Sequence, residues 1–254
     1  MEIFSKIAEL QAAHTPCILC VITATKGSTP RKAGSKMLVM ADGSIFGTIG
    51  GGSIELAVIK EALQVFSTGE PRFKEYQLEE DLSMHCGGSV DVYFDPVLTL
   101  PKLYIYGAGH VGRALGKYAS TLGFRIFFYD ERPDIYKEFQ LEGAECITGN
   151  YFETINNTVF DEHTYIVITT PKHEFDENIL AAVARKPHAY LGMIGSKRKV
   201  AEARKRFIAE GILTKEELDT VDMPIGLPFA AETPEEIAIS IVAKLIDTRN
   251  TLKK

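Results

Sequence analysis

Three glycines with the spacing G-x-G-x-x-G, Gly107, Gly109 and Gly112, follow the apolar run 103–106 and open a segment with helical apolar spacing. In that setting the first glycine makes a tight turn, the second lets a pyrophosphate approach the backbone, and the third lets helix and strand pack closely. The unpaired N–H groups at the helix start favour an anion. Asp130 follows the next apolar run, where NAD-binding domains place an acid for the ribose hydroxyls. The pattern predicts a Rossmann strand–turn–helix–strand unit.

A second glycine cluster, Gly50, Gly51 and Gly52, lies between a predicted strand and a predicted helix. A two-residue turn needs one glycine at most, and three glycines allow a ligand to come close to backbone N–H groups. We therefore expect these glycines to contact an anion or another ligand. The alternative, which the sequence leaves open, is that they only make a tight turn.

Cys86 stands next to His85 and is followed by Gly87 and Gly88. A neighbouring positive charge lowers the pKa of a thiol, so this arrangement is typical of a reactive thiolate. A structural cysteine beside a surface histidine explains the same residues equally well. Both interpretations of Cys86 stay open on the sequence alone.

Apolar strands alternate with helical segments after residue 102, which is typical of a parallel sheet with right-handed crossovers. In such sheets ligands bind beyond the carboxyl ends of the strands. The loops after Tyr106, Tyr129, Thr169 and Ile194 should therefore share one crevice. Its predicted lining is Gly107–Gly112, Asp130, Arg132, His173, Ser196 and Lys197–Lys199.

The basic run Lys197–Lys199 stands at the first turn of a predicted helix. Positive side chains there oppose the helix dipole, which favours negative charge at a helix N-terminus. We interpret the run as a contact for an anionic ligand. A solvated charged face is the alternative.

The composition disfavours several classes of protein. The chain has 254 residues, 34 acidic against 28 basic and a formal net charge of −6, which argues against nucleic-acid or membrane-surface binding. Its N-terminus lacks the apolar centre of a signal peptide, and no apolar run approaches the ~20 residues that span a bilayer, so we expect a cytoplasmic protein.

The four cysteines are scattered, which argues against an iron–sulfur cluster, and we predict no metal site. Cys17 and Cys20 should be buried on opposite faces of a strand.

The expected fold class is α/β, with a small mixed α+β N-terminal domain followed by a Rossmann-like parallel-sheet C-terminal domain. The segment Asp95–Pro101 is predicted to be a linker because it carries prolines near both ends. It divides the chain into domains 1–97 and 98–254. The N-terminal prediction is a helix over 2–13 and strands over 17–25, 36–40 and 44–49. Residues 50–55 then lead into a helix that ends at about residue 66, and strands follow over 72–78 and 89–94.

The C-terminal prediction has strands over 103–106, 124–129, 165–169 and 189–194. Helices are expected up to about residue 122, over 174–184 and from residue 195 onward. Two capping boxes, Thr214 with Glu217 and Thr233 with Glu236, predict two further helix starts. The stretch between Asp130 and Tyr165 carries only a weak pattern.

Taken together, these motifs resemble the XdhC/CoxI family of xanthine dehydrogenase accessory proteins over nearly the whole chain. Some relatives carry a cysteine where this chain has Ser53, and many have a Thr-His pair where this chain has Thr170–His173. The shared elements are Gly27-Ser-x-Pro-Arg31, Gly47–Gly52 with Glu55, Cys86–Gly88, Gly107–Gly112, Asp130-x-Arg132, Lys172-His173 with Asp176, Gly192–Ser196 with Lys199, Pro224–Leu227 and Thr233–Ile237.

The resemblance implies an accessory protein that binds the molybdenum cofactor, a pterin with a phosphate and a dithiolene-bound metal. It implies delivery of that cofactor to xanthine dehydrogenase or another molybdenum hydroxylase, with a cysteine desulfurase as a further partner. We also expect a homodimer in which the N-terminal domain of one subunit lies over the crevice of the other, because both domains carry glycine-rich loops. Cys86 and His173 are the candidates for chemical roles. The candidate cofactor-binding residues are Arg31, Gly50, Gly51, Gly52, Glu55, Gly107, Gly109, His110, Gly112, Asp130, Arg132, Ser196, Lys197 and Lys199.

Two other functions stay open beside this non-enzymatic carrier. An NAD(P)-dependent oxidoreductase would hold the ribose hydroxyls with Asp130, which favours NAD over NADP, and would use His173 or Lys172 as acid or base. A nucleotide-sensing module would couple a ligand to a partner without chemistry. Molybdopterin that co-purifies with the protein would favour the carrier, and tight binding of NAD would favour the oxidoreductase.

Overall fold

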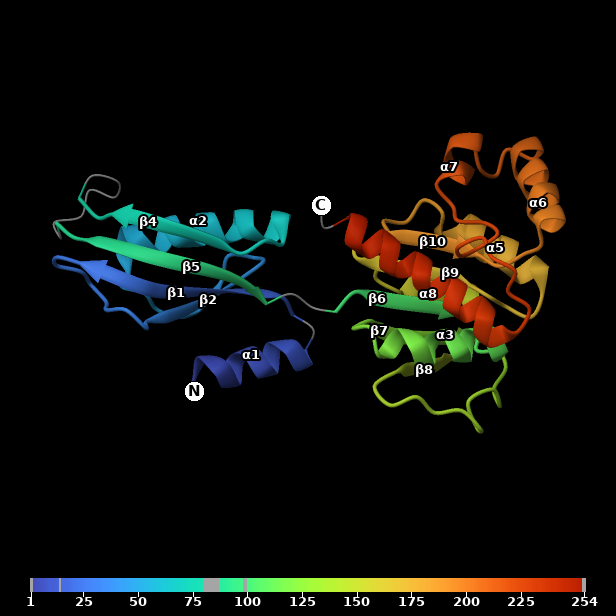
Figure 1. The fold of residues 1–254 in the computed structure, drawn as a ribbon, viewed down its shortest axis with the longest axis horizontal. Helices are drawn as coiled ribbons and strands as arrows, with labels where there is room; N and C mark the ends of the chain where they lie inside the picture. Colours follow the sequence, from blue (N-terminus) through green and yellow to red (C-terminus); the bar gives the residue numbers. More distant parts are fainter. Residues whose placement is uncertain (1, 14, 80–86, 98–99, 253–254) are drawn as a thin grey trace. The chain divides into compact units, whose positions relative to one another are not determined.

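The computed structural model describes residues 2–13, 15–79, 87–97 and 100–252. The chain packs as two compact units, Met1–Thr99 and Leu100–Lys254, each with its own five-stranded sheet (Figure 1). Strand pairs are antiparallel in the first sheet and parallel in the second. The predicted α/β fold class, with a mixed N-terminal part and a Rossmann-like C-terminal part, is confirmed.

In the N-terminal unit the strand order is β3-β2-β1-β5-β4. Helix α2 packs on one face of this sheet through Ile54, Val58 and Val65, and α1 packs on the other face through Leu10. The elements are α1 Ile3–Ala12, β1 Cys17–Lys26, β2 Lys36–Met40, β3 Ile45–Gly47, α2 Gly52–Thr68, β4 Arg72–Gln77 and β5 Ser89–Val97.

The predicted linker is wrong at its start. Residues 95–97 continue strand β5 and pair with residues 17–19 of β1. Strand β4 reaches only as far as Phe94, so Pro96 is paired on one side alone, with β1, where a sheet can accommodate a proline.

The two cysteines of β1 lie on opposite faces of the sheet, as the alternation of a strand predicts. Cys17 packs with Leu10 and Leu38, whereas Cys20 packs in the cluster that α2 covers. Both thiols are free and fully buried. Burial raises the pKa of each thiol, and burial together with the nearby Cys17 raises that of Cys20 to about 12.

We expect Cys17 and Cys20 to resist alkylation in the folded protein at neutral pH, because their thiols are neither accessible nor ionised. Cys146 is exposed and should be modified well before either of them. Timed iodoacetamide treatment followed by peptide mass spectrometry measures the three rates, with a denatured sample as the control. Equal rates at Cys17 and Cys146 would contradict this expectation.

In the C-terminal unit the strand order is β10-β9-β6-β7-β8. The elements are β6 Lys102–Tyr106, α3 His110–Ser120, β7 Arg125–Asp130, β8 Glu145–Thr148, α4 Tyr151–Asn157, β9 Thr164–Ile168, α5 His173–Val183, β10 Tyr190–Met193, α6 Lys197–Ala209, α7 Lys215–Asp219 and α8 Pro234–Thr251.

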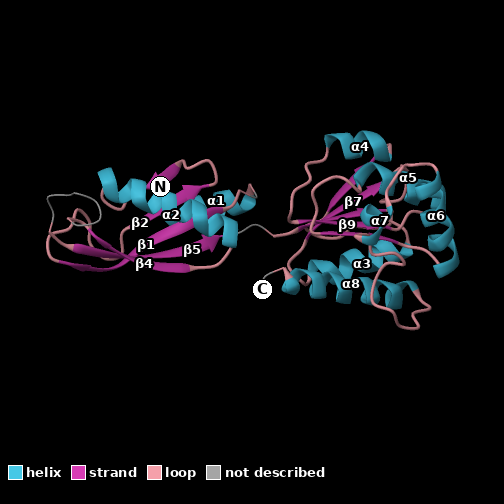
Figure 2. Cartoon of the chain, turned by 90° about the horizontal axis from the view of Figure 1, so that it is seen from above, coloured by secondary structure: helices cyan, strands magenta, loops and turns pink. Residues whose placement is uncertain are grey.

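Helices cover both faces of the parallel sheet. Helices α3 and α8 pack side by side on one face, and α4, α5, α6 and α7 cover the other (Figure 2). The chain runs from β6 outward to β7 and β8, then returns to place β9 on the other side of β6. This reversal is the topological switch point at which α/β sheets bind ligands, beyond the carboxyl ends of the strands.

Two elements after Asp130 have no counterpart in the prediction. Strand β8 lies at the sheet edge and is mostly exposed, and the short helix α4 buries only Tyr151 and Ile155. Elements with so few buried side chains leave little periodic pattern of apolar residues in the sequence.

Both predicted capping boxes are confirmed, Thr214 with Glu217 at the start of α7 and Thr233 with Glu236 at the start of α8. Among the helices in the described part of the chain, none is long and apolar enough to cross a membrane.

Candidate functional site

The loop after β6 is a tight turn that packs against the end of β9. Gly107 has φ +107°, and a Cβ on it would lie 2.3 Å from the carbonyl oxygen of Thr169. A Cβ on Gly112 would lie 2.0 Å from the carbonyl oxygen of Gly107. Any side chain at either position would collide with backbone. The fold of the turn therefore requires both glycines.

Gly109 differs from its two neighbours in the motif. Its φ of −74° and ψ of −169° suit any residue, and a Cβ there would meet nothing nearer than the Arg132 guanidinium at 4.0 Å. The fold itself therefore does not require glycine at this position. A glycine here leaves the backbone at the start of α3 open to a ligand, as an anion at a helix N-terminus requires.

Asp130, at the end of β7, is fully buried and is bound by the protein itself. Its Oδ2 accepts the N–H of Ala108 at 2.8 Å and Nη2 of Arg132 at 2.7 Å. Its Oδ1 accepts the backbone N–H and Nε of Arg132 at 3.0 and 2.8 Å. Burial by itself would raise the pKa of Asp130, but the hydrogen bonds from Arg132 and Ala108 outweigh it and hold the pKa below its usual value.

Both carboxylate oxygens of Asp130 are therefore engaged within the protein. The ribose hydroxyls of a dinucleotide would have to displace Arg132 to reach them. The guanidinium gives Nε and Nη2 to Asp130, and its Nη1 edge has no acceptor among the described residues, while 44% of the Arg132 side chain is exposed. The arrangement presents a fixed positive charge beside Gly109.

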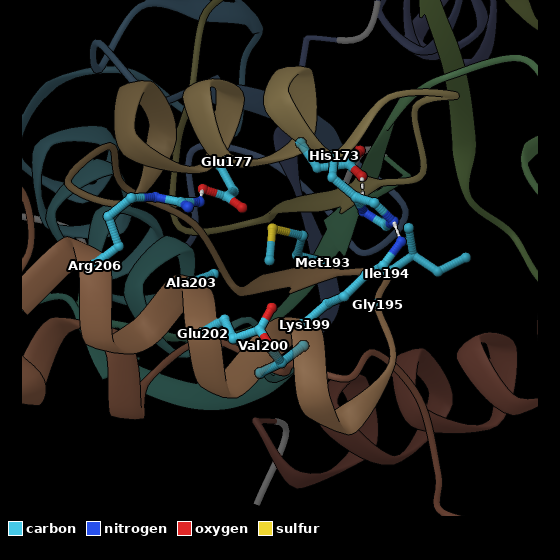
Figure 3. Close-up of a pocket in the computed structure, with 11 residues that line it drawn as sticks. His173, Glu177, Met193, Ile194, Gly195, Lys199, Val200, Glu202, Ala203 and Arg206 are labelled. Atoms are coloured by element: carbon cyan, nitrogen blue, oxygen red, sulfur yellow. Dashed lines mark hydrogen bonds and ion pairs between the residues drawn. The ribbon is translucent and has the colours of Figure 1, made fainter.

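A second group of polar side chains lies between the starts of α5 and α6 (Figure 3). Nζ of Lys199 hydrogen-bonds Nε2 of His173, and Nδ1 of His173 lies 3.4 Å from Oδ2 of Asp176. Asp176 is only 1% exposed, and its Oδ1 accepts the N–H and hydroxyl of Thr170 at 2.8 and 2.6 Å. Burial raises the pKa of Asp176 above its usual value, although the bonds from Thr170 and the nearby His173 oppose it.

A cavity of about 190 Å³ opens beside His173 and Lys199. Figure 3 shows Met193 in its wall and an ion pair between Glu177 of α5 and Arg206 of α6 at one end. The cavity therefore joins an apolar wall to a cluster of ionisable groups at the edge of the sheet.

The remaining predicted residues of this unit lie at the same edge, in the loops and helix starts that follow the strands. His110 is the first residue of α3 and is exposed. Ser196 caps α6, with its hydroxyl accepting the N–H of Lys199 at 3.3 Å. Lys197 and Arg198 are exposed and do not line the cavity, so Lys199 alone of the basic run contacts His173.

The glycine turn of the N-terminal unit is bound by the helix that follows it. Oε1 of Glu55, in the first turn of α2, accepts the N–H groups of Ile49 and Gly51 at 3.1 and 2.9 Å and the hydroxyl of Thr48. Burial would raise the pKa of Glu55, but these bonds prevail and hold it below its usual value. The carboxylate takes the position that we expected an external anion to occupy, and those two N–H groups are not free while Glu55 holds them.

The loop 27–34, which carries Arg31, packs on this turn. A Cβ on Gly50 would lie 2.9 Å from Cβ of Pro30. A Cβ on Gly88 would lie 2.5 Å from the carbonyl oxygen of Ser28, so the segment after Cys86 reaches the same loop. Arg31 is itself exposed.

Cys86 lies outside the described residues. Within the described ranges, no group of three histidine, cysteine, aspartate or glutamate side chains is placed to bind a metal. Asp176 and Thr170 were not among the predicted site residues. The spacing of three between His173 and Asp176 places them on one face of a helix, and this was the signal that could have identified Asp176.

Two family models match the chain. One, described as the XdhC Rossmann domain, matches residues 103–245, and the other, described as the XdhC and CoxI family, matches residues 10–77. Together they cover most of the region over which the sequence motifs are spread, residues 27–237.

Two individual relatives match most of this chain. The uncharacterised protein YqeB of Escherichia coli (strain K12) is 32% identical over 260 residues, which cover 98% of this chain and 47% of YqeB. The molybdenum cofactor insertion chaperone PaoD of the same organism is 22% identical over 265 residues, covering 91% of this chain and 83% of PaoD. This chain thus spans about half the length of YqeB and most of that of PaoD.

A crystal structure of a xanthine dehydrogenase from Bacillus halodurans has a similar fold. Its TM-score is 0.54 at 23% identity, covering 99% of this chain and 96% of that one. At this identity the likeness shows a common fold and nothing about the reaction.

Proposed function

Because the chain belongs to the XdhC and CoxI family, we propose that it binds the molybdenum cofactor and delivers it to a molybdenum hydroxylase such as xanthine dehydrogenase. The name of PaoD, a molybdenum cofactor insertion chaperone, supports an accessory role. The client enzyme and the cysteine desulfurase are parts of this proposal that rest on the sequence resemblance. The homodimer is a further part, and it rests on the glycine-rich loops of both domains.

The observation that carries the proposal is the contact between Asp130 and Arg132. A dinucleotide site of the usual kind offers a free carboxylate to the ribose. Here the Asp130 carboxylate already accepts hydrogen bonds from Arg132 and from the N–H of Ala108. The group that remains exposed to a ligand is the Arg132 guanidinium. A ligand at this turn therefore meets a positive guanidinium where the usual site has a negative carboxylate. This favours binding of a phosphate over binding of ribose hydroxyls.

The residues present fit the phosphate end of the cofactor. Arg132 supplies an open guanidinium edge, Gly109 leaves the start of α3 accessible, and Lys199 adds a second cation at the same edge of the sheet. When bound, the molybdenum cofactor supplies its own redox chemistry. The work of this chain would be to hold the cofactor by its anionic end and keep it available for transfer.

We expect the purified protein to bind about one molybdopterin per chain under anaerobic conditions, and Arg132→Ala to weaken that binding by about tenfold or more, since a charge-assisted contact to phosphate is lost. Lys137→Ala is the matched control, because Lys137 is a cation of the same loop in an exposed pair with Asp134. Gel filtration followed by pterin fluorescence measures the bound cofactor.

Absence of molybdopterin binding in the wild-type protein would overturn the proposal. Equal losses in Arg132→Ala and Lys137→Ala would remove the role assigned to Arg132. Calorimetry with NAD and NADH provides the comparison for the oxidoreductase. A dissociation constant well below about 1 mM for either nucleotide, together with no molybdopterin binding, would favour the oxidoreductase instead.

A further inference from the structure

The hydrogen bond between Lys199 and His173 determines where the imidazole proton lies. A lysine ammonium has only donors, so Nε2 of His173 must be the acceptor and carry no proton. The remaining ring proton is then on Nδ1, which faces Oδ2 of Asp176 at 3.4 Å. In this arrangement His173 is neutral, and the histidine and the lysine together carry a single positive charge.

The carboxylate of Asp176 lies next to His173 and is buried. Its Oδ2 is buried and makes no well-formed hydrogen bond among the described residues, since Nδ1 of His173 lies 3.4 Å away. Buried carboxylate oxygens are normally paired, and each exception calls for a physical reason. The nitrogen nearest to this oxygen is Nδ1 of His173, and an imidazolium there would give the carboxylate a full counter-charge. Asp176 is therefore placed to stabilise a positive charge on the His173 imidazole, in addition to the charge of Lys199. Without a ligand, the imidazole does not carry that charge.

The surroundings of the pair accept an anion. Helix α5 begins at His173 and α6 begins at Lys197, so two helix N-termini meet at the same edge, beside the cavity of about 190 Å³. The His173 side chain is 49% exposed, which leaves Nε2 accessible once Lys199 moves aside. An anion can approach both nitrogens from solvent.

The other charged groups that line the cavity have partners of their own. Glu177 pairs with Arg206, and Glu202 lies 3.8 Å from Arg198. In the loop before α5, the Lys172 ammonium lies over a phenylalanine ring. Among the described residues, no carboxylate lies within ion-pair distance of Lys199. The Lys199 ammonium beside His173 thus has no carboxylate that neutralises it, and its charge is available to a ligand.

From these contacts we infer that His173, Asp176 and Lys199 form a proton-linked clamp for a phosphate monoester. The dianion enters between Nε2 of His173 and Nζ of Lys199 and replaces their mutual hydrogen bond with two bonds to its own oxygens. His173 takes up one proton from solvent on Nε2, and Asp176 balances the imidazolium through Nδ1. Asp176 acts here as a positioning residue. That the anion belongs to the molybdenum cofactor rests on the function proposed above. The clamp and Arg132 are then alternative positions for its single phosphate, and Lys199→Met and Arg132→Ala distinguish them.

Proton uptake couples the affinity of this clamp to pH. Binding that takes up about one proton weakens by up to about tenfold for each unit of rising pH. The carrier would therefore hold its ligand more tightly in mildly acidic solution. The same coupling means that raising the pH, or any partner contact that restores the bond between Lys199 and His173, favours release.

Sulfate is the probe that isolates the protein's own proton. It stays dianionic between about pH 6 and pH 8, whereas a phosphate monoester titrates near pH 6 and would add its own proton to the count. Calorimetric titration of the full chain with sulfate, in two buffers of different ionisation enthalpy, measures the protons taken up. We expect about 0.5 to 1 proton per sulfate near neutral pH and an affinity that falls as the pH rises.

The variants separate the clamp from general electrostatics. His173→Gln should abolish the proton uptake and make sulfate binding weak and independent of pH. Lys199→Met should weaken binding by about tenfold. Asp176→Asn should keep sulfate binding but lower the proton uptake, because the imidazolium loses its counter-charge. Lys205→Met is the matched control, since Lys205 is an exposed cation of the same helix, and it should behave as wild type.

Proton uptake that persists in His173→Gln, no detectable sulfate binding to the wild-type protein, or equal effects of Lys199→Met and Lys205→Met would each overturn the clamp. The outcome is separable from that of the proposed function. Molybdopterin binding that is unaffected by His173→Gln and Lys199→Met would refute the clamp and leave the carrier intact. Proton-linked sulfate binding without molybdopterin binding would support the clamp and refute the carrier.

Discussion

Replacing Gly112 by alanine is expected to lower the free energy of unfolding by about 3 kcal/mol or more, or to prevent folding of the C-terminal unit. The new Cβ would lie 2.0 Å from the carbonyl oxygen of Gly107, and backbone cannot move aside as a side chain can. Relief requires the start of α3 to shift away from β6, which separates the turn from the helix. Urea unfolding followed by circular dichroism measures the loss.

Gly109→Ala is the matched comparison within the same motif. Its Cβ would meet nothing closer than the Arg132 guanidinium at 4.0 Å, and its backbone angles suit alanine. We expect a stability change within about 0.5 kcal/mol of wild type. Binding of molybdopterin should nevertheless weaken, because the methyl group stands where the ligand would approach the start of α3. A large loss of stability in Gly109→Ala, or none in Gly112→Ala, would contradict this division between a structural and a ligand-facing glycine.

Asp130→Ala is expected to lower the free energy of unfolding by about 3 kcal/mol. The substitution leaves the N–H of Ala108 without its acceptor and removes the counter-charge of Arg132. Asp134→Ala is the control, because Asp134 forms only an exposed pair with Lys137 and should change stability by about 0.5 kcal/mol or less. Equal stability changes in the two variants would show that the Asp130 contacts contribute little.

The contribution of Asp130 should also depend on pH. Its pKa in the folded protein is held below its usual value, chiefly because hydrogen bonds from Arg132 outweigh burial. Its stabilising effect is therefore complete above the unfolded pKa of about 4 and is lost as the pH falls through the folded value. The stability difference between wild type and Asp130→Asn should be constant from about pH 5 to pH 8 and should shrink below about pH 4. Urea unfolding across that range tests the sign.

The parallel sheet could be predicted because its central strands are short apolar runs that are buried on both faces. Strand β9, for example, is buried at every position. The capping boxes at Thr214 and Thr233 could be predicted because each is a purely local pattern of residues. The meeting of four loops at one edge followed from the geometry of a parallel sheet. Each of these features depends on residues that are close in sequence or on a general rule of topology.

The contacts within the site could not be predicted, because they depend on which of several polar groups pair across the fold. The sequence shows Asp130 at a ribose-binding position but not that Arg132 bends back onto it. The three glycines of the N-terminal turn suggest an external anion, whereas the carboxylate of Glu55 binds there. Asp176 is placed by the packing of α5 against β9, and the burial of its carboxylate is a tertiary property.

The contact between Asp130 and Arg132 has a further consequence for the kinetics of binding. An arginine side chain free in solvent samples many rotamers, and fixing one on a ligand typically opposes binding by about 0.5–1.5 kcal/mol of conformational entropy. Here two hydrogen bonds from the guanidinium to a buried carboxylate orient Arg132 before any ligand arrives. The ligand therefore meets an Arg132 guanidinium that is already oriented and has one edge free. Association should need little rearrangement of the protein, and its rate constant should be close to the limit set by diffusion and charge.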